Sequence, residues 1–170
     1  MILHTLTAED FEPLTAIITE FIDILAPGVE AVDARPFFAG AGNVGFRTED
    51  RNGYVLFPYL GQPGMYDGHL ICRPKITKPI EIGRAGVALM FTHWRASVIS
   101  ALIPKANRAS RVAFRAIGGK PIGDSVDVLG RPCTAYVLEQ GEWVKSLGPS
   151  RALRVPLWGS RREVRPPSSH

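Results

Sequence analysis

Asp67 and His69 are the residues of this chain whose types and spacing could move a proton. They lie two positions apart in the run 65–72, which predicts a strand, and alternate residues of a strand share one face. An imidazole titrates near neutral pH, so His69 is a candidate general base, and Asp67 is a second one. A hydrogen-bonded histidine within a sheet would give the same pattern. Two ligands without a third do not make a metal site, so we expect no bound metal.

Asn107 stands at a predicted joint between a strand and a helix. The preceding run 98–103 is apolar and rich in β-branched residues, and it ends at Pro104. The helix that follows has an apolar face and stops at Gly118. Asparagine caps helices in any fold, so capping accounts for Asn107 without a ligand.

Three arginines form a stripe on this helix. Arg108, Arg111 and Arg115 follow the spacing i, i+3, i+7, which places them opposite the apolar face. The stripe is either a solvated face or a binding surface for phosphate or for an acidic patch on a protein. Residues 9–33 hold seven acids and no base, so the same segment of a second copy would be complementary to the stripe.

Hydrophobic periodicity and turn residues predict the order β-α-α-β-β-β-α-β-α-β-β over residues 1–142. The expected strands are 2–6, 44–48, 54–60, 65–72, 98–103, 120–128 and 134–138, and the expected helices are 11–25, 29–38, 81–94 and 107–117. Asp10 is expected to cap the first helix.

This order, with Asn107 at the strand-to-helix joint, resembles the GNAT family of N-acetyltransferases over residues 1–142. The resemblance implies an α+β fold with a mixed, mostly antiparallel central sheet flanked by helices. The runs 65–69 and 103–109 are similar to acetyltransferase-like proteins of tailed bacteriophages, some of which are virion components.

The resemblance also implies a site for acetyl-CoA. In the family, its pyrophosphate binds the N-terminus of the helix after the fourth strand, where small residues let it approach free backbone N–H groups. The matching stretch makes Gly83, Gly86 and Ala88 the expected cofactor-binding residues, although Gly83 replaces the family's Arg or Gln. These small residues would also let a helix pack closely on a sheet. Asn107 is expected to contact the pantetheine arm as well.

The family often places a tyrosine seven residues after this asparagine, as the acid that protonates the leaving thiolate. Here the position is Phe114, which has no hydroxyl group. Tyr136 or Tyr66 could replace it only if the fold brings one of them to the thioester.

Residues 143–170 are expected to be a basic, Pro-rich tail outside the domain. Six basic residues lie from Lys145 onward, against one acid. Apolar residues are interleaved with them, which favours docking on a protein partner through Arg154, Leu157 and Trp158 over contact with nucleic acid. A purely disordered tail would be less apolar.

Composition sets the remaining limits. The two cysteines, Cys72 and Cys133, lie far apart and predict separate buried thiols. No apolar run is long enough for a membrane span and no basic leader is present, which predicts a cytoplasmic protein. For a phage component, the expected place is the host cytoplasm during assembly and then the virion.

Three functions follow. The first is a structural or interaction protein of a phage particle, which explains Phe114 and the missing Arg or Gln. The alternative is an acyl-CoA-dependent N-acyltransferase, which explains Asn107 and the small residues from Gly86 to Ala88. The third is an adaptor that contacts nucleic acid through the arginine stripe and the tail.

Overall fold

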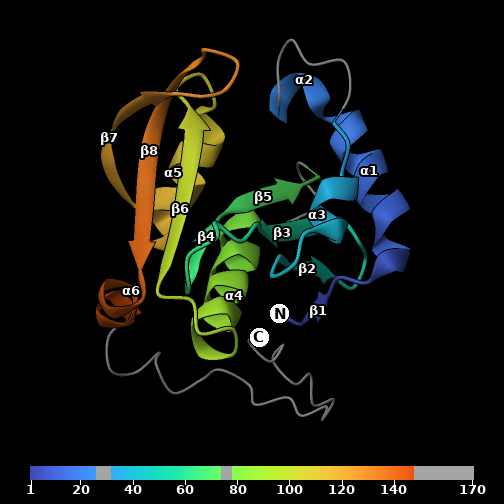
Figure 1. Ribbon diagram of the computed structural model, residues 1–170, viewed down its shortest axis with the longest axis horizontal. Coiled ribbons are helices and arrows are strands. Elements are labelled where there is room, and N and C mark those ends of the chain that lie inside the picture. The colour runs from blue at the N-terminus through green and yellow to red at the C-terminus, as the bar shows by residue number, and fades with distance from the viewer. Residues whose placement is uncertain (26–31, 74–77, 148–170) are drawn as a thin grey trace.

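The computed structural model describes residues 1–25, 32–73 and 78–147, which form two four-stranded sheets with helices on both sides. In Figure 1 the first sheet and helices α1–α3 lie on the right, the second sheet with α5 and α6 on the left, and α4 between them. The α+β class and the mostly antiparallel pairing expected from the sequence are confirmed, but the single central sheet is divided into two.

The N-terminal sheet has the strand order β1-β2-β3-β5, and all its pairs are antiparallel. Its strands are β1 (Leu3–Thr5), β2 (Val44–Thr48), β3 (Gly53–Phe57) and β5 (His69–Cys72). Side chains of β3 alternate between two cores, as the period of a strand requires. Tyr54 and Leu56 face one cluster, and Val55 and Phe57 face the other.

The C-terminal sheet has the strand order β4-β6-β8-β7. Its strands are β4 (Met65–Asp67), β6 (Val98–Pro104), β7 (Lys120–Val126) and β8 (Pro132–Glu139). β4 pairs with β6 in parallel, and the other pairs are antiparallel. β7 carries a bulge between Pro121 and Gly123, and all seven of its residues are exposed.

Helices cover the sheets through apolar stripes with helical spacing. They are α1 (Phe11–Glu20), which follows the 3₁₀ turn η1 (Ala8–Asp10), then α2 (Ile22–Leu25), α3 (Arg35–Ala39), α4 (Pro79–Thr92), α5 (Arg108–Ile117) and α6 (Gln140–Leu147). α1 packs Leu14, Ile17 and Ile18 on one face of the N-terminal sheet. α4 packs Ile82, Val87 and Met90 on the opposite face. None of the helices within the described ranges is long and apolar enough to cross a membrane.

Three local expectations are corrected. The strand expected over 65–72 is two strands, β4 and β5, because Gly68 breaks it. The helix expected over 29–38 is present as α3 from Arg35 onward, while residues 26–31 lie outside the described part of the chain. The helix expected over 81–94 begins at Pro79, whose fixed φ suits a first turn, and ends at Thr92.

The tail begins later than expected, because α6 belongs to the folded body. Trp143 is only 6% exposed, its ring lies 5.5 Å from that of Phe91, and its Nε1–H donates to the Ile117 carbonyl at 3.2 Å. The folded body therefore extends at least to Leu147, past the boundary expected after residue 142. Arg154, Leu157 and Trp158 lie outside the described residues.

The two cysteines are not bonded to each other, as expected, but only Cys133 is fully buried, and Cys72 is half-buried. Desolvation on burial raises the pKa of the Cys133 thiol, which keeps it protonated and unreactive near neutral pH.

Asp10 directly precedes α1 as expected, but its side chain makes no capping hydrogen bond to that helix, so the predicted cap is wrong. Its carboxylate is completely buried and accepts from the Thr7 N–H at 3.0 Å. Arg47 Nε lies 2.7 Å and Arg51 Nε 3.0 Å from its Oδ1. Arg51 stands in the turn between β2 and β3, where it has a positive φ of 55°. The cluster ties the start of α1 to the first hairpin.

We predict that Asp10→Ala lowers the free energy of unfolding by about 3 kcal/mol, because it removes a buried carboxylate and leaves the partly buried guanidiniums of Arg47 and Arg51 without their partner. Burial raises the pKa of Asp10, but the Thr7 N–H and the two arginines more than offset this, so the pKa lies below its ordinary value of 3.8. The stabilisation is therefore complete above that value and is lost as the pH falls through the folded pKa. Chemical denaturation at several pH values measures both effects.

The matched control is Asp33→Ala, which removes an exposed ion pair with Arg35 and should cost less than about 1 kcal/mol. Equal losses for the two variants would contradict the role given to Asp10.

Candidate functional site

The site is built around the break at Gly68. β4 pairs with β6 up to the partners Asp67 and Ser100, and the Gly68 N–H donates to the Ser100 carbonyl at 2.8 Å. A Cβ at position 68 would lie 3.0 Å from Ile99 Cγ2 and 3.3 Å from the Ser100 oxygen, so glycine allows this close approach. Beyond Gly68 the chain leaves β6 and continues as β5 beside β3.

β5 and the second half of β6 therefore diverge from a vertex at Gly68. β5 is the edge strand of its sheet, and no strand among the described residues pairs with its other side. An unpaired strand edge presents backbone N–H and C=O groups to any ligand that carries amides. The opening thus offers hydrogen bonds that do not depend on side chains.

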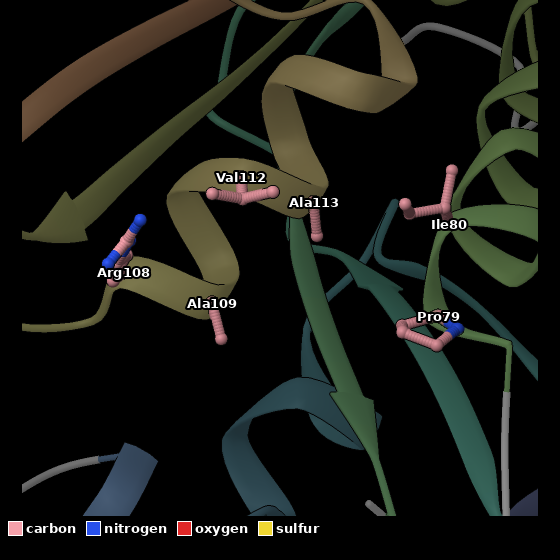
Figure 2. Close-up of a pocket in the computed structure, with 6 residues that line it drawn as sticks. All are labelled: Pro79, Ile80, Arg108, Ala109, Val112 and Ala113. Atoms are coloured by element: carbon pink, nitrogen blue, oxygen red, sulfur yellow. The ribbon is translucent and has the colours of Figure 1, made fainter. Parts of the chain in front are cut away.

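A groove lies between α4 and α5. The two helices touch through Gly83, where a Cβ would stand 2.3 Å from Ile117 Cδ1, and through the Arg84 Nη2–H bonded to the Ala116 carbonyl at 2.7 Å. Towards their N-termini they leave an open groove with a volume of about 520 Å³. Figure 2 shows its lining, which consists of Pro79 and Ile80 from α4 and Arg108, Ala109, Val112 and Ala113 from α5.

The groove suits an extended apolar ligand with an anionic end. Arg108 is the only charged residue among the described residues that line the groove, and in Figure 2 it lies at the start of α5, across from Pro79. The first turns of α4 and α5 both border the groove, and helix N-termini favour negative charge. Val112 is 55% exposed although it belongs to the apolar face of α5, so this face is left open instead of being buried.

The expected phosphate-binding residues do not form a loop. Gly83, Gly86 and Ala88 lie in the interior of α4, where the backbone N–H groups belong to the helical ladder. Gly83 and Gly86 are buried, and a Cβ at Gly86 would lie 3.1 Å from Val55 Cγ1. Their small size serves close packing against α5 and β3, which corrects the assignment to the cofactor. The N-terminus of α4 lies at Pro79.

Asn107 caps α5. Its Oδ1 accepts from the Ser110 N–H at 3.0 Å, which satisfies one of the four free donors at the start of the helix. The residue stands beside Arg108 at the end of the groove. The cap fixes the first turn of α5 where it borders the groove.

Asp67 and His69 are brought together across the vertex. His69 Nε2 lies 3.0 Å from Asp67 Oδ2, with side chains 51% and 27% exposed. The carboxylate fixes the proton on Nε2, and no described residue bonds Nδ1, which keeps its lone pair for an incoming proton. His69 is the cross-strand partner of Leu56, so it lies on the α1 face, opposite the groove between α4 and α5.

Ser100 is a site residue that sequence reasoning missed. Its Oγ lies 3.4 Å from the Tyr66 carbonyl and 3.5 Å from Asp67 Oδ1. Only the parallel register of β4 with β6 places it there, and no sequence motif marks that register.

Phe114 stands at the vertex. Its Cε2 lies 3.7 Å from the position of a Cβ at Gly68. Tyr136 packs on the far side of this ring, with 5.7 Å between ring centroids. Tyr66 packs against Tyr59 at 5.7 Å, and desolvation raises the pKa of its hydroxyl. The structure therefore places an apolar ring at the vertex, and neither tyrosine takes its place there.

The arginine stripe is divided between two surroundings. Arg108 lines the groove, whereas the Arg115 guanidinium lies 5.8 Å from the centroid of the Tyr136 ring on β8. Arg111 is half-buried, and its Nε has no hydrogen-bond partner among the described residues. Within the same residues, no group of three or more His, Cys, Asp or Glu side chains could hold a metal ion.

Comparison with known proteins gives a fold and no sequence relative. No protein-family model matches the chain, and no curated protein matches it in sequence. Among solved structures, it resembles aminoglycoside acetyltransferase AAC(6')-Ib in complex with coenzyme A and kanamycin, with a TM-score of 0.66 and 14% identity over 85% of this chain and 97% of that one.

It also resembles spermidine N-acetyltransferase from Vibrio cholerae in complex with CoA and spermine. Here the TM-score is 0.67 and the identity 12%, over 84% of this chain and 97% of that one. At such identities the likeness shows the fold alone. The fold is that of the GNAT acetyltransferases, as the sequence resemblance had implied.

We predict that Asn107→Ala lowers the free energy of unfolding by about 1 kcal/mol, because the Ser110 N–H loses its acceptor. Asn107→Asp keeps an acceptor at the same place and should retain most of that stability. Urea denaturation measures both variants. If Asn107→Ala were as stable as the parent chain, the capping role would be contradicted.

Proposed function

We propose that this protein is an acyl-CoA-dependent N-acyltransferase that transfers an acyl group to an amine. The observation that carries the proposal is the vertex at Gly68, with a groove on one face of the sheets and the Asp67–His69 pair on the other. A thioester held at the vertex from the groove side would meet an amine arriving on the face of His69. Proximity of this kind is itself a large part of catalysis.

The described residues fit coenzyme A. Arg108 and the first turns of α4 and α5 suit its phosphates, and Ala109, Val112 and Ala113 suit its apolar parts. The free edge of β5 suits the two amides of the pantetheine arm. When bound, acetyl-CoA supplies the activated acyl group.

His69 is assigned the proton transfer. As the new C–N bond forms, the amine nitrogen must lose a proton, and His69 Nδ1 can accept it directly or through one water. Asp67 holds the opposite ring nitrogen and stabilises the imidazolium that results. Phe114 supplies no proton, so the sulfur released when the C–S bond breaks takes its proton from water.

An amine is the acceptor class that the comparisons favour. The similar structures hold kanamycin or spermine, both of which carry amino groups. This supports an amine acceptor without identifying it.

The second candidate is a component of a phage particle that uses the fold without transfer chemistry. Phe114 at the vertex favours it, because the position lacks a proton donor. The buried Gly83 also favours it, because no Arg or Gln side chain is present at that position. This candidate requires that acetyl-CoA does not bind in the groove.

For the groove, we predict that the parent chain binds acetyl-CoA with micromolar affinity in titration calorimetry. Val112→Glu should weaken this at least about tenfold, because it places a carboxylate where phosphates and an apolar chain must lie. The control Val144→Glu changes an equally exposed valine on α6, away from the groove, and should bind like the parent. No heat from folded parent protein at millimolar ligand would favour the phage component instead.

For the proton transfer, we predict that His69→Ala lowers kcat by about 10²–10⁴-fold and leaves acetyl-CoA affinity unchanged. Asp67→Asn should lower kcat less than His69→Ala does, because the imidazole remains and loses only the carboxylate charge that orients it. The control is His4→Ala, which removes an exposed histidine from β1. Because His69 is half-exposed, its removal should leave Tm nearly unchanged, so a folded His69→Ala variant with full turnover would refute this role.

A further inference from the structure

Charged side chains in this protein are mostly paired within the chain. Arg35, Arg47, Arg51, Arg73 and Arg131, and Lys78, Lys105, Lys120 and Lys145, all form ion pairs with carboxylates. Among the described arginines, five have no carboxylate partner: Arg84 and Arg95, which stand apart, and Arg108, Arg111 and Arg115, which share α5. Arg84 bonds to the Ala116 carbonyl instead. Arg108 belongs to the groove, which leaves Arg111 and Arg115.

Arg111 and Arg115 lie on the side of α5 that faces β8, away from the groove. Arg115 is exposed, and its guanidinium lies over the Tyr136 ring. Next to them is the uncovered surface of β7. Val126 is 63% exposed and pairs with Pro132 of β8. Pro132 lies on the same face of β8 as Tyr136, which is the face towards α5, so Val126 lies on that face too. Ile122, in the bulge of β7, is 65% exposed.

These four residues form what we call the arginine strip: Arg111, Arg115, Ile122 and Val126. The strip combines two unpaired positive charges with two exposed apolar side chains. The acid beside them, Asp124, is already bonded to Lys105 at 2.6 Å. The strip therefore fits a surface with free carboxylates.

Such a surface exists on the same chain. Three acids of the N-terminal segment already form ion pairs within the chain: Asp10, Glu20 and Asp33. Glu9 and Glu12 are exposed in η1 and the first turn of α1, three positions apart, and no described residue pairs with them. The exposed Ala16 lies one turn further along, where a small side chain lets an apolar partner approach.

The two surfaces cannot meet within one molecule. In Figure 1, α1 lies at the right edge of the fold and β7 at the left edge, with both sheets between them. A contact between the acids and the arginines must therefore join two copies.

We propose that a second copy of this chain docks on the arginine strip through Glu9 and Glu12 of its α1. Carboxylates of one copy pair with Arg111 and Arg115 of the other, and Ile122 and Val126 pack beside them. The contact is heterologous, because it uses different surfaces of the two copies, so it builds a ring or an open chain. It is independent of acyl transfer and would hold whichever function is correct.

The test is sedimentation equilibrium of the full chain at low and high salt. Association should depend on concentration and weaken as salt rises, because exposed charge pairs are screened. Arg115→Glu should raise the dissociation constant about tenfold or more, since it opposes two like charges. The matched control, Arg95→Glu, reverses another exposed arginine without a described carboxylate partner and should associate like the parent.

A charge swap makes the test specific. The double variant Glu9→Lys/Glu12→Lys should also lose association. Mixing it with Arg115→Glu should restore pairing, because the unchanged strip of the first variant meets the unchanged acids of the second. A chain that stays monomeric in low salt overturns the proposal. The proposal is also overturned if Arg115→Glu associates as strongly as the parent chain. It is likewise overturned if association disappears when residues 148–170 are removed, because the contact would then belong to the tail.

Discussion

The hydrogen bond from the Gly68 N–H to the Ser100 carbonyl marks the end of the pairing between β4 and β6. It marks the point where the two sheets part, because past it β5 follows β3 and leaves β6. A side chain at position 68 would crowd Ile99 and the Ser100 backbone, so the close approach depends on glycine. Every feature of the site follows from this divergence. The free edge of β5 faces the opening, and Phe114 lies at its vertex.

The divergence also separates two chemical surroundings. On one face, α4 and α5 are locked together at Gly83 and Ile117 and open towards their N-termini, which leaves an apolar groove with Arg108 at its rim. On the other face, Asp67 orients His69. A donor and an acceptor can therefore reach the same point from opposite sides without competing for space. The Asp10 cluster, far from the vertex, fixes α1 against the N-terminal sheet.

Element types and their order could be predicted from the sequence because apolar periodicity is a local signal. Alternation along one strand was the basis for pairing Asp67 with His69, but the two residues lie on separate strands, and it is the break at Gly68 that leaves them 3.0 Å apart. The predictions that failed concern features that depend on tertiary packing. Gly83 and Gly86 match the family's phosphate-binding pattern in sequence, and only the contacts with Ile117 and Val55 show that these glycines serve close packing. Ser100 needed the parallel register, and Trp143 needed the pocket formed by Phe91 and Ile117.

The most direct test of the central claim is to follow backbone amide signals by NMR while acetyl-CoA is added. The account predicts perturbation of residues 69–72 on β5, of Ile80 and Glu81 in the first turn of α4, and of residues 108–113 on α5. Residues 122–126 on β7 should not change. An unchanged spectrum at millimolar ligand, or changes confined to residues away from the opening, would contradict the claim that the divergence at Gly68 forms a binding site for acyl-CoA.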